Sequence, residues 1–372
     1  MMSATYIIYF SLIVFEMLLA HCDVRSKKAV SVYGIFLILL YSVVAGLKYS
    51  IGPDFQGYLL FYQNAYFGNE TGSHFEEGFI LMNRILANLQ IPPVFYFIFL
   101  NCINIASLYY LTKNIYPIAL PFAVAIFIMI DNGFSLSTNI YRQYVAISLN
   151  CFLLPLLLKN RLKYFYILGC WLLASFHTSA WLCVIFFVLR DIKVVNNNNR
   201  ILFIIMLALT YVFGPYIYSQ FSSLFSLVSS LIGYEDRTYL TSGQYKIQQD
   251  PGLGVFLRFI QTSIIIYYYP KVSKFVNSKL FEIIFNAFLF ASVIKALIVM
   301  DIAVVRTICY MTILEYLLMS VTICCILKSR PKHGNSALIF VVILIYVLLF
   351  CIAIDKSDNW MSPYVVFPSL IG

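Results

Sequence analysis

The sequence predicts an all-α fold, a polytopic integral membrane bundle of about 10 full transmembrane helices plus a short hairpin. The 372 residues are 62% hydrophobic and only 11% charged, whereas soluble domains carry about 25% charged residues. Long apolar runs recur from one end of the chain to the other. Because a backbone in lipid must satisfy its own hydrogen bonds, such runs form helices. We expect residues 1–372 to form a single transmembrane domain with 10–12 membrane segments in total.

Each predicted helix rests on an apolar run. A spanning helix needs about 20 predominantly apolar residues. Ten runs approach or reach that length, and the first is interpreted as a retained helix. They are 4–22, 29–47, 92–112, 117–131, 139–158, 201–219, 254–270, 280–299, 307–327 and 337–354.

The run 164–189 is long for one crossing and short for two, and the loop charges indicate how it folds. Six connecting segments hold 16 of the 25 Lys and Arg residues. Placing all six on the cytoplasmic side satisfies the positive-inside rule. Lys163 and Arg190 then lie on the same side, so 164–189 is predicted to be a hairpin with His177 at its apex. A single crossing would instead put Arg190, Lys193 and Arg200 outside.

Two polar segments, 48–78 and 220–253, are predicted to be outer loops, and 79–90 an interfacial helix. Both loops are rich in Tyr and Phe. Aromatic residues at this level are typical of a membrane-interface belt, and they also suit a sugar-binding wall.

Several classes of function find no support in the sequence. The net charge of +9 comes mostly from short loops between apolar runs, which favours a topology signal over a nucleic-acid partner. There is no DxD, no HExxH, no P-loop and no Walker-type glycine pattern. The four histidines are far apart in topology, and the nine cysteines lack CxxC spacing. We therefore predict no metal and no cofactor.

Charged residues gather in the predicted outer loops and at the outer ends of helices. Each alone could be a snorkelling side chain, but ionisable residues at membrane depth mark substrate paths by default. The set is Asp54, Glu76, Glu77, Arg142, His177, Arg258, Asp301 and Arg306.

The arginines suit a phosphorylated ligand. Guanidinium grips phosphate oxygens with a planar fork. Arg142 shares a helix face with Asn139, and Arg306 has a similar position at a helix end. Arg258 shares a face with Gln261. These spacings favour Arg142 and Arg306 as diphosphate ligands, with Arg258 as a weaker candidate.

The remaining candidates carry protons or position sugars. An imidazole in general titrates near neutral pH, so His177 is suited to proton transfer or to a hydrogen bond to a sugar hydroxyl or phosphate. Asp54 follows a Gly-Pro turn and either orients a sugar or caps a helix at Phe55. The same two roles are open to Glu77, and Glu76 is a weaker candidate than Glu77. Glu16 and Glu315 are interpreted as structural, with Lys295 as a candidate partner for Glu315.

Four short motifs occur in the order and spacing of a known family. They are "KYSIGPDFQGY" (48–58), "EEGF" (76–79), "NIYRQYVA" (139–146) and "SFHTSAW" (175–181), followed by Arg306 and "SPYVVF" (362–367). This pattern resembles the EpsG-like family of bacterial polysaccharide polymerases, which is close to the O-antigen polymerases called Wzy. The chain departs from it at Lys48, where the family usually has arginine, and at Phe55, where it usually has tyrosine. Lysine keeps the charge but loses the bidentate fork.

The resemblance implies a GT-C-like glycosyltransferase of the bacterial inner membrane with its active site facing the periplasm. It joins oligosaccharide repeat units carried on undecaprenyl pyrophosphate, which serve as both donor and acceptor. The family also implies a co-polymerase partner that determines chain length. Carried onto this sequence, it makes His177, Arg142, Arg306, Asp54 and Glu77 the catalytic candidates. The substrate-binding candidates are Arg258, Asn139, Gln143, Lys48 and Tyr58.

Three alternatives stay open. A flippase for the same lipid-linked units needs charges along a cavity that reaches both faces. A membrane O-acyltransferase would take acyl groups from the cytoplasmic side, and a purely structural subunit would leave the outer charges unexplained. A deletion strain separates the first two from a polymerase. Loss of a polymerase leaves single repeat units on the surface lipid, loss of a flippase leaves none, and loss of an acyltransferase leaves long chains without acyl groups.

Overall fold

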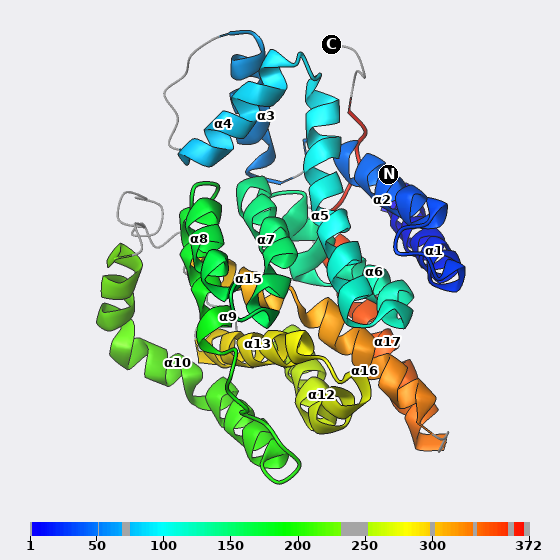
Figure 1. The fold of residues 1–372 in the computed structure, drawn as a ribbon, viewed down its shortest axis with the longest axis vertical. Coiled ribbons are helices and arrows are strands. Elements are labelled where there is room, and N and C mark those ends of the chain that lie inside the picture. Colours follow the sequence, from blue (N-terminus) through cyan, green and yellow to red (C-terminus); the bar gives the residue numbers. More distant parts are fainter. Residues whose placement is uncertain are drawn as a thin grey trace.

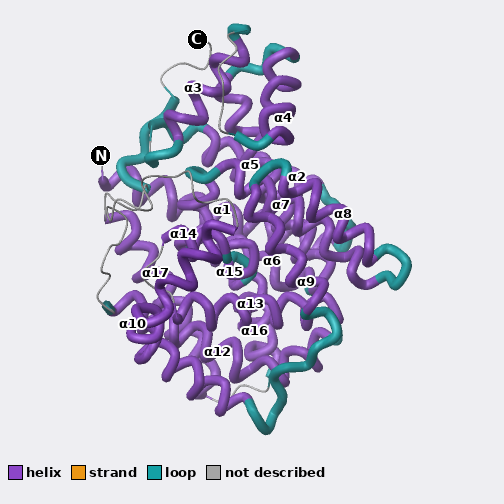
Figure 2. Tube along the Cα trace, turned by 90° about the vertical axis from the view of Figure 1, so that its left-hand side faces the viewer, coloured by secondary structure: helices purple, strands orange, loops and turns teal. Residues whose placement is uncertain are grey.

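The computed structural model describes residues 2–50, 52–68, 75–231, 252–297, 302–329, 333–355 and 361–367. Within these ranges the regular elements are helices joined by short loops (Figure 2). Six helices are long and apolar enough to cross a membrane, and four shorter apolar helices accompany them. The prediction of an all-α polytopic membrane protein is confirmed.

The expected spans fall on helices in order along the chain (Figure 1). The run 254–270 lies in α12, which has the length of a span but is not one of the six apolar enough to cross. The helices are α1 (Met2–Ser26), α2 (Val32–Gly46), α5 (Pro93–Ile115), α6 (Leu120–Met129), α7 (Tyr141–Leu153), α10 (Arg200–Leu231), α12 (Leu253–Val276), α13 (Lys279–Leu297), α16 (Glu315–Lys328) and α17 (His333–Asp355).

The segment 164–189 folds back on itself. It consists of α8 (Lys163–Ala174), the 3₁₀ turn η4 (Thr178–Cys183) and the short helix α9 (Val184–Val188). The rings of Tyr164 and Phe187, near its two ends, are 6.0 Å apart. The Tyr166 hydroxyl donates to the carbonyl of Cys183 at 2.9 Å. The predicted hairpin is therefore present, and its apex lies between the end of α8 and the start of η4.

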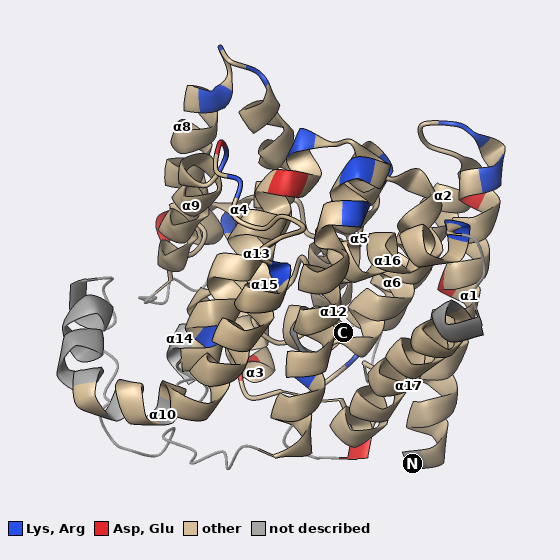
Figure 3. Ribbon diagram, turned by 90° about the horizontal axis from the view of Figure 1, so that it is seen from below, with Lys and Arg blue, Asp and Glu red and all other residues tan. Residues whose placement is uncertain are grey.

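Lys and Arg concentrate at one end of the bundle, the upper end in Figure 3, where α8 begins and α1 meets α2. We call this the basic end. Since both ends of the 164–189 hairpin lie at the basic end, its apex points toward the opposite end of the bundle. Outward-facing side chains such as Phe15, Phe36 and Leu168 are apolar and exposed, as expected for a surface in lipid.

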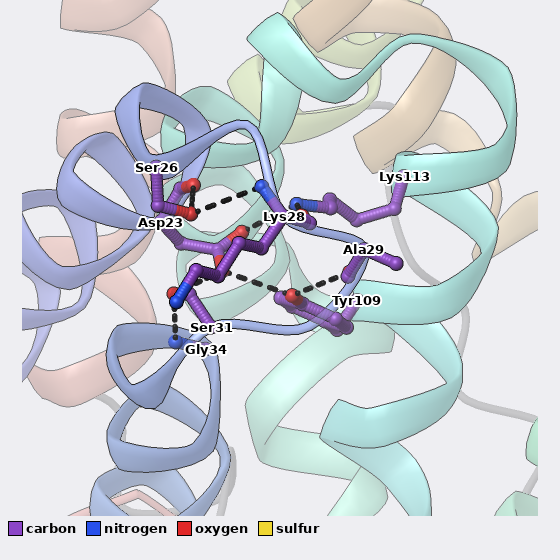
Figure 4. Close-up of polar contacts among 8 residues, drawn as sticks. All are labelled: Asp23, Ser26, Lys28, Ala29, Ser31, Gly34, Tyr109 and Lys113. Carbon is purple, nitrogen blue, oxygen red and sulfur yellow. Dashed lines mark hydrogen bonds and ion pairs between the residues drawn. The ribbon is translucent and has the colours of Figure 1, made fainter.

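A polar network secures the α1–α2 connection at the basic end (Figure 4). The buried carboxylate of Asp23 pairs with Lys113 of α5 at 2.8 Å. It also accepts hydrogen bonds from Ser31 at 2.6 Å and from Tyr109 at 3.0 Å. Ser31 caps α2 by accepting from the Gly34 amide. These contacts fix where α2 starts, and α2 leads directly to the segment after residue 46.

The expected outer loop 48–78 contains a helix, α3 (Phe55–Tyr66), and the expected interfacial helix is α4 (Glu77–Asn88). Aromatic side chains pack α3 against α4 and α5, with Phe55 stacked on Phe97 at 4.8 Å. Of the second expected loop, 220–231 continues α10, and 232–251 lies outside the described residues.

The closing segment 361–367 returns to the end of α2. The Tyr49 amide donates to the carbonyl of Val365 at 2.8 Å, and the Phe367 amide donates to the carbonyl of Leu47 at 2.9 Å. Lys48 and Val366 form an antiparallel bridge. The C-terminal motif "SPYVVF" is therefore hydrogen-bonded to the segment that leads to Asp54 and stabilises it.

Candidate active site

Five segments that are distant in the sequence meet beside the hairpin apex. They are the residues before α3, the start of α4, the start of α7, the α8–η4 turn and the pair of short helices α14 (Ile302–Thr307) and α15 (Cys309–Thr312). Helices α7 and α8 lie side by side in Figure 1, and α15 contacts η4. The described site residues come from the ends of these elements.

The chain breaks its helical path before α7, which places polar residues at a helix start. Helix α6 ends at Met129, and Gly133 has non-helical backbone angles inside the irregular turn that follows. Helix α7 then begins at Tyr141, so Asn139, Arg142 and Gln143 lie at its N-terminus. Free backbone N–H groups and the helix dipole make such a terminus favourable for anions.

Arg142 forms an ion pair with Glu76, the residue that precedes α4. Its guanidinium also stacks over the ring of Phe75 at 4.3 Å. The other carboxylate oxygen of Glu76 accepts from the Thr178 amide at 3.1 Å and from the Thr178 hydroxyl at 3.3 Å. Glu76 therefore connects α7 to the hairpin apex.

The charge of Glu76 is stabilised in place. Burial alone would raise the pKa of this carboxyl, but Arg142 and then His177 oppose it, and the pKa ends below its ordinary value of 4.5. Glu76 is thus ionised at neutral pH and interacts electrostatically with both Arg142 and His177.

Gly78 permits the close approach of α4 to the hairpin. Its amide donates to the carbonyl of Ser175 at 2.8 Å. A Cβ atom at this position would lie 2.2 Å from the Ser175 hydroxyl oxygen. The glycine of "EEGF" is therefore required by packing, and it sets the position of Glu76.

Asp54 and Arg306 form a second, more open pair. Their Oδ2 and Nη1 atoms are 3.8 Å apart, and about a third of each side chain is exposed. Gln143 donates to the backbone carbonyl of Arg306 at 2.5 Å. Asn139 accepts from the Asp54 amide at 3.2 Å. The second pair is therefore attached to the same helix start as the first.

Two buried donors at this helix start lack an acceptor within the described ranges. They are Nε of Arg142 and Nδ2 of Asn139. An unsatisfied buried donor costs about 1–3 kcal/mol. Both donors are suited to the oxygen atoms of an anionic ligand.

His177 lies at the hairpin apex, at the N-terminal boundary of η4. Its Nδ1 is 2.7 Å from the Ser179 hydroxyl. Ser179 in turn donates to the hydroxyl of Tyr310 at 3.3 Å. His177 also interacts electrostatically with Glu76. The imidazole is therefore next to the first ion pair and attached to α15.

The contacts connect Asp54, Arg142, His177 and Arg306, together with Asn139 and Gln143. Tyr58 is also adjacent, because burial raises its pKa while the nearby Arg142 opposes that rise. Glu77 is exposed in the first turn of α4, whereas Glu76, which the sequence analysis ranked below it, forms the ion pair with Arg142. Glu76 and not Glu77 makes this contact because Glu76 precedes α4 with an extended backbone.

Of two other candidates, Lys48 lies at the edge of the cluster and Arg258 lies apart from it. Lys48 is buried, donates to Thr138 at 2.8 Å, and burial lowers its pKa to about 7. Its contact is therefore with the residue before Asn139. Arg258 interacts electrostatically with Glu315 and Lys295 inside the bundle, and that pairing includes the expected Lys295 partner. Asp301 lies outside the described residues.

Sequence reasoning did not identify Thr178, Ser179 and Tyr310. The first two follow His177 inside "SFHTSAW", and Tyr310 lies four residues after Arg306. Arg306 and Tyr310 lie in two separate short helices, α14 and α15, so their spacing of four residues does not place them on one helix face. The sequence therefore contains no direct signal for Tyr310.

Comparison with curated proteins and with solved structures gives no match. A family model described as the EpsG family matches residues 31–366 and spans every residue of the cluster. Members of this family have a membrane polysaccharide polymerase-like function. The chain belongs to the EpsG family.

Proposed function

We propose that this protein is a polysaccharide polymerase of the O-antigen type. It joins oligosaccharide repeat units carried on undecaprenyl pyrophosphate at the periplasmic face of the bacterial inner membrane. The supporting observation is the meeting of Arg142, Arg306 and His177 around one helix start, with buried donors that suit an anion.

The arginines bind the diphosphate of the donor lipid. Glu76 and Asp54 orient the two guanidinium groups before substrate arrives. The phosphate oxygens then accept from both guanidinium groups, from Asn139 and from the start of α7. As the sugar–phosphate bond breaks, negative charge grows on the diphosphate, and preorganised donors stabilise that charge.

The reaction joins two lipid-linked units. A hydroxyl on the non-reducing sugar of the acceptor attacks the anomeric carbon of the donor glycan. The bond between that carbon and the diphosphate oxygen breaks, and undecaprenyl pyrophosphate leaves with the bonding electrons. The donor is already activated, so no nucleotide is consumed. His177 contacts either the diphosphate or the acceptor hydroxyl.

The orientation follows from the charges. If the basic end faces the cytoplasm, as the positive-inside rule requires, the hairpin apex and both ion pairs face the periplasm. There the protein would meet its lipid-linked substrates, membrane lipids and a co-polymerase that sets chain length.

One observation favours a second candidate, a flippase for the same lipids. Arg258, Lys295 and Glu315 bring charge into the interior of the bundle, where ionisable groups accompany transport paths. The deletion strain distinguishes the two functions, because a flippase mutant displays no repeat unit on its surface lipid.

The test is complementation of the deletion strain. We expect the Arg142→Ala and Arg306→Ala proteins to insert into the membrane but to leave the strain with single repeat units on its surface lipid. Arg84→Ala, which removes an exposed arginine of α4 outside the cluster, should restore full-length chains. Normal chain length with both arginine variants would overturn the proposal.

A further inference from the structure

The contacts of His177 extend into the protein through two hydroxyl groups. His177 Nδ1 is 2.7 Å from Ser179, and Ser179 donates to Tyr310 at 3.3 Å. Ser179 and Tyr310 are each 1% exposed. Both hydroxyls are therefore shielded from water, and their hydrogen bonds depend on each other.

The backbone holds this arrangement in a fixed geometry. The His177 amide donates to the carbonyl of Leu173 at 3.2 Å, and the His177 carbonyl accepts from Ala180 at 2.9 Å. Ser179 belongs to the same 3₁₀ turn. The short spacing between residues 177 and 179 thus directs the serine hydroxyl to the ring nitrogen nearer the backbone.

The direction of the hydrogen bonds selects a tautomer of the imidazole. A serine hydroxyl has one proton, and that of Ser179 is donated to Tyr310. Ser179 must then accept at its other contact, so Nδ1 of His177 carries a proton. A neutral imidazole has only one N–H. The lone pair that can accept a proton therefore lies on Nε2.

We propose that Ser179 and Tyr310 are positioning residues that hold His177 with Nδ1 protonated, which makes Nε2 the general base for the acceptor sugar hydroxyl. This inference rests on the proposed function and decides between the two roles that it leaves to His177. An Nε2 without a proton cannot donate to a phosphate oxygen. The diphosphate is therefore left to Arg142 and Arg306.

The proton balance of the step is complete. The acceptor hydroxyl loses its proton to Nε2 while its oxygen bonds to the anomeric carbon. The bond from that carbon to the diphosphate breaks, and the diphosphate takes the electron pair. His177 becomes an imidazolium, which the nearby carboxylate of Glu76 stabilises. The proton then passes to water, and the neutral ring is restored.

The chemical environment matches this role. Glu76 keeps its own position through Thr178 and Arg142, so its negative charge is present before the imidazolium forms. Thr178, which holds Glu76, is the residue between His177 and Ser179. One turn of chain therefore supplies the base, the residue that orients it and the residue that positions its counter-charge.

The tautomer is measurable without substrate. Nitrogen-15 NMR of histidine-labelled full-length protein in lipid nanodiscs, with the signal assigned by His177→Asn, reports which ring nitrogen is protonated. We expect Nδ1–H in the wild type. Ser179→Ala and Tyr310→Phe should shift the signal toward Nε2–H, the form that neutral imidazole prefers in water. A wild-type Nε2–H signal would overturn the inference even if both variants failed to fold.

Turnover gives the second readout, measured with lipid-linked repeat units in proteoliposomes. General base catalysis contributes about 10²–10⁴-fold, and Ser179→Ala misorients the base without removing it. We expect kcat to fall about 10–100-fold with KM unchanged, and Ser179→Thr to recover most of the loss. The matched control is Ser292→Ala, since Ser292 is buried and bonds only to a carbonyl of its own helix among the described residues.

The two proposals fail in different ways. If Arg142→Ala polymerises normally, the proposed function fails, whatever the tautomer. If Arg142→Ala is inactive while Ser179→Ala matches Ser292→Ala in turnover and leaves the NMR signal unchanged, only the positioning role is refuted.

Discussion

Removing the charge of Glu76 should destabilise the folded protein by leaving Arg142 without its counter-charge. The side chain of Arg142 is 9% exposed and that of Glu76 is 17% exposed. Breaking a buried pair by removing one partner costs about 3–5 kcal/mol. Because Glu76 keeps some contact with solvent, we expect about 3 kcal/mol for Glu76→Gln. Glutamine keeps an acceptor for Thr178, so the loss reports the charge.

Removing both charges should recover most of that loss. In the double variant Glu76→Gln/Arg142→Met, no buried charge remains unpaired, and methionine fills much of the volume of the arginine stem. Replacing a whole buried pair by apolar groups is often close to neutral. We expect the double variant to be about 2 kcal/mol more stable than Glu76→Gln alone.

The assay is thermal unfolding of the purified protein in detergent, followed by tryptophan fluorescence. Trp171 and Trp181 flank the hairpin apex and report its loss. Glu77→Gln is the matched control, since this neighbouring carboxylate is exposed. If the change in melting temperature of the double variant equals the sum of the changes in Glu76→Gln and Arg142→Met, the two side chains are not coupled and the pairing is refuted.

The pH dependence offers an independent check of the same pair. The pKa of Glu76 in the folded protein lies below its ordinary value of 4.5. The unfolded chain therefore binds the proton first as the pH falls. The stabilisation is complete above about pH 4.5 and is lost as the pH falls through the folded pKa. Glu76→Gln should lack this acid-dependent component.

Three further predictions concern neighbouring residues. Arg306→Lys keeps the charge but loses the fork, so chain extension in proteoliposomes should fall about 100-fold, and a loss below threefold would contradict the diphosphate role. Burial lowers the Lys48 pKa to about 7, so the charged lysine destabilises the folded state below that pH, and the lost stability recovers between pH 7 and about 10.5. Lys48→Met should therefore raise the melting temperature most below pH 7. An equal rise at every pH would refute this. Gly78→Ala places a Cβ atom 2.2 Å from the Ser175 hydroxyl oxygen and 2.9 Å from the Ser175 carbonyl oxygen and should destabilise the fold by about 1–3 kcal/mol. The control Gly57→Ala lies in α3, where the Cβ meets nothing within 4 Å, and should leave the stability unchanged or raise it by up to about 1 kcal/mol.

Much of the fold was predictable because lipid simplifies the problem. Apolar runs in a bilayer have few alternatives to helix, so the expected spans fall on helices. The 164–189 hairpin followed from basic residues at both of its ends. A helix start at Phe55 was one of two alternatives for Asp54, but the extent of α3 was missed because its sequence, "FQGYLLFYQNAY", mixes polar and aromatic residues. It is helical because its aromatic face packs on α4 and α5, a contact that local sequence does not reveal.

The site was predictable to the level of which segments meet, but less so to the level of single contacts. Arg142, Arg306, His177 and Asp54 stood out as charges at helix ends. The choice of Glu76 over Glu77 depends on which of two adjacent carboxylates precedes the helix. The bond from Ser179 to Tyr310 joins residues 131 positions apart, and such a contact is set by packing.

The most direct test of the central claim is a reconstituted reaction with one lipid-linked repeat unit as both donor and acceptor. The purified protein in proteoliposomes should release one undecaprenyl pyrophosphate for each glycosidic bond formed. Arg142→Ala and Arg306→Ala should each reduce both products together while the protein stays folded. Bond formation at the wild-type rate in these two variants would contradict the assignment of the paired arginines to the leaving diphosphate.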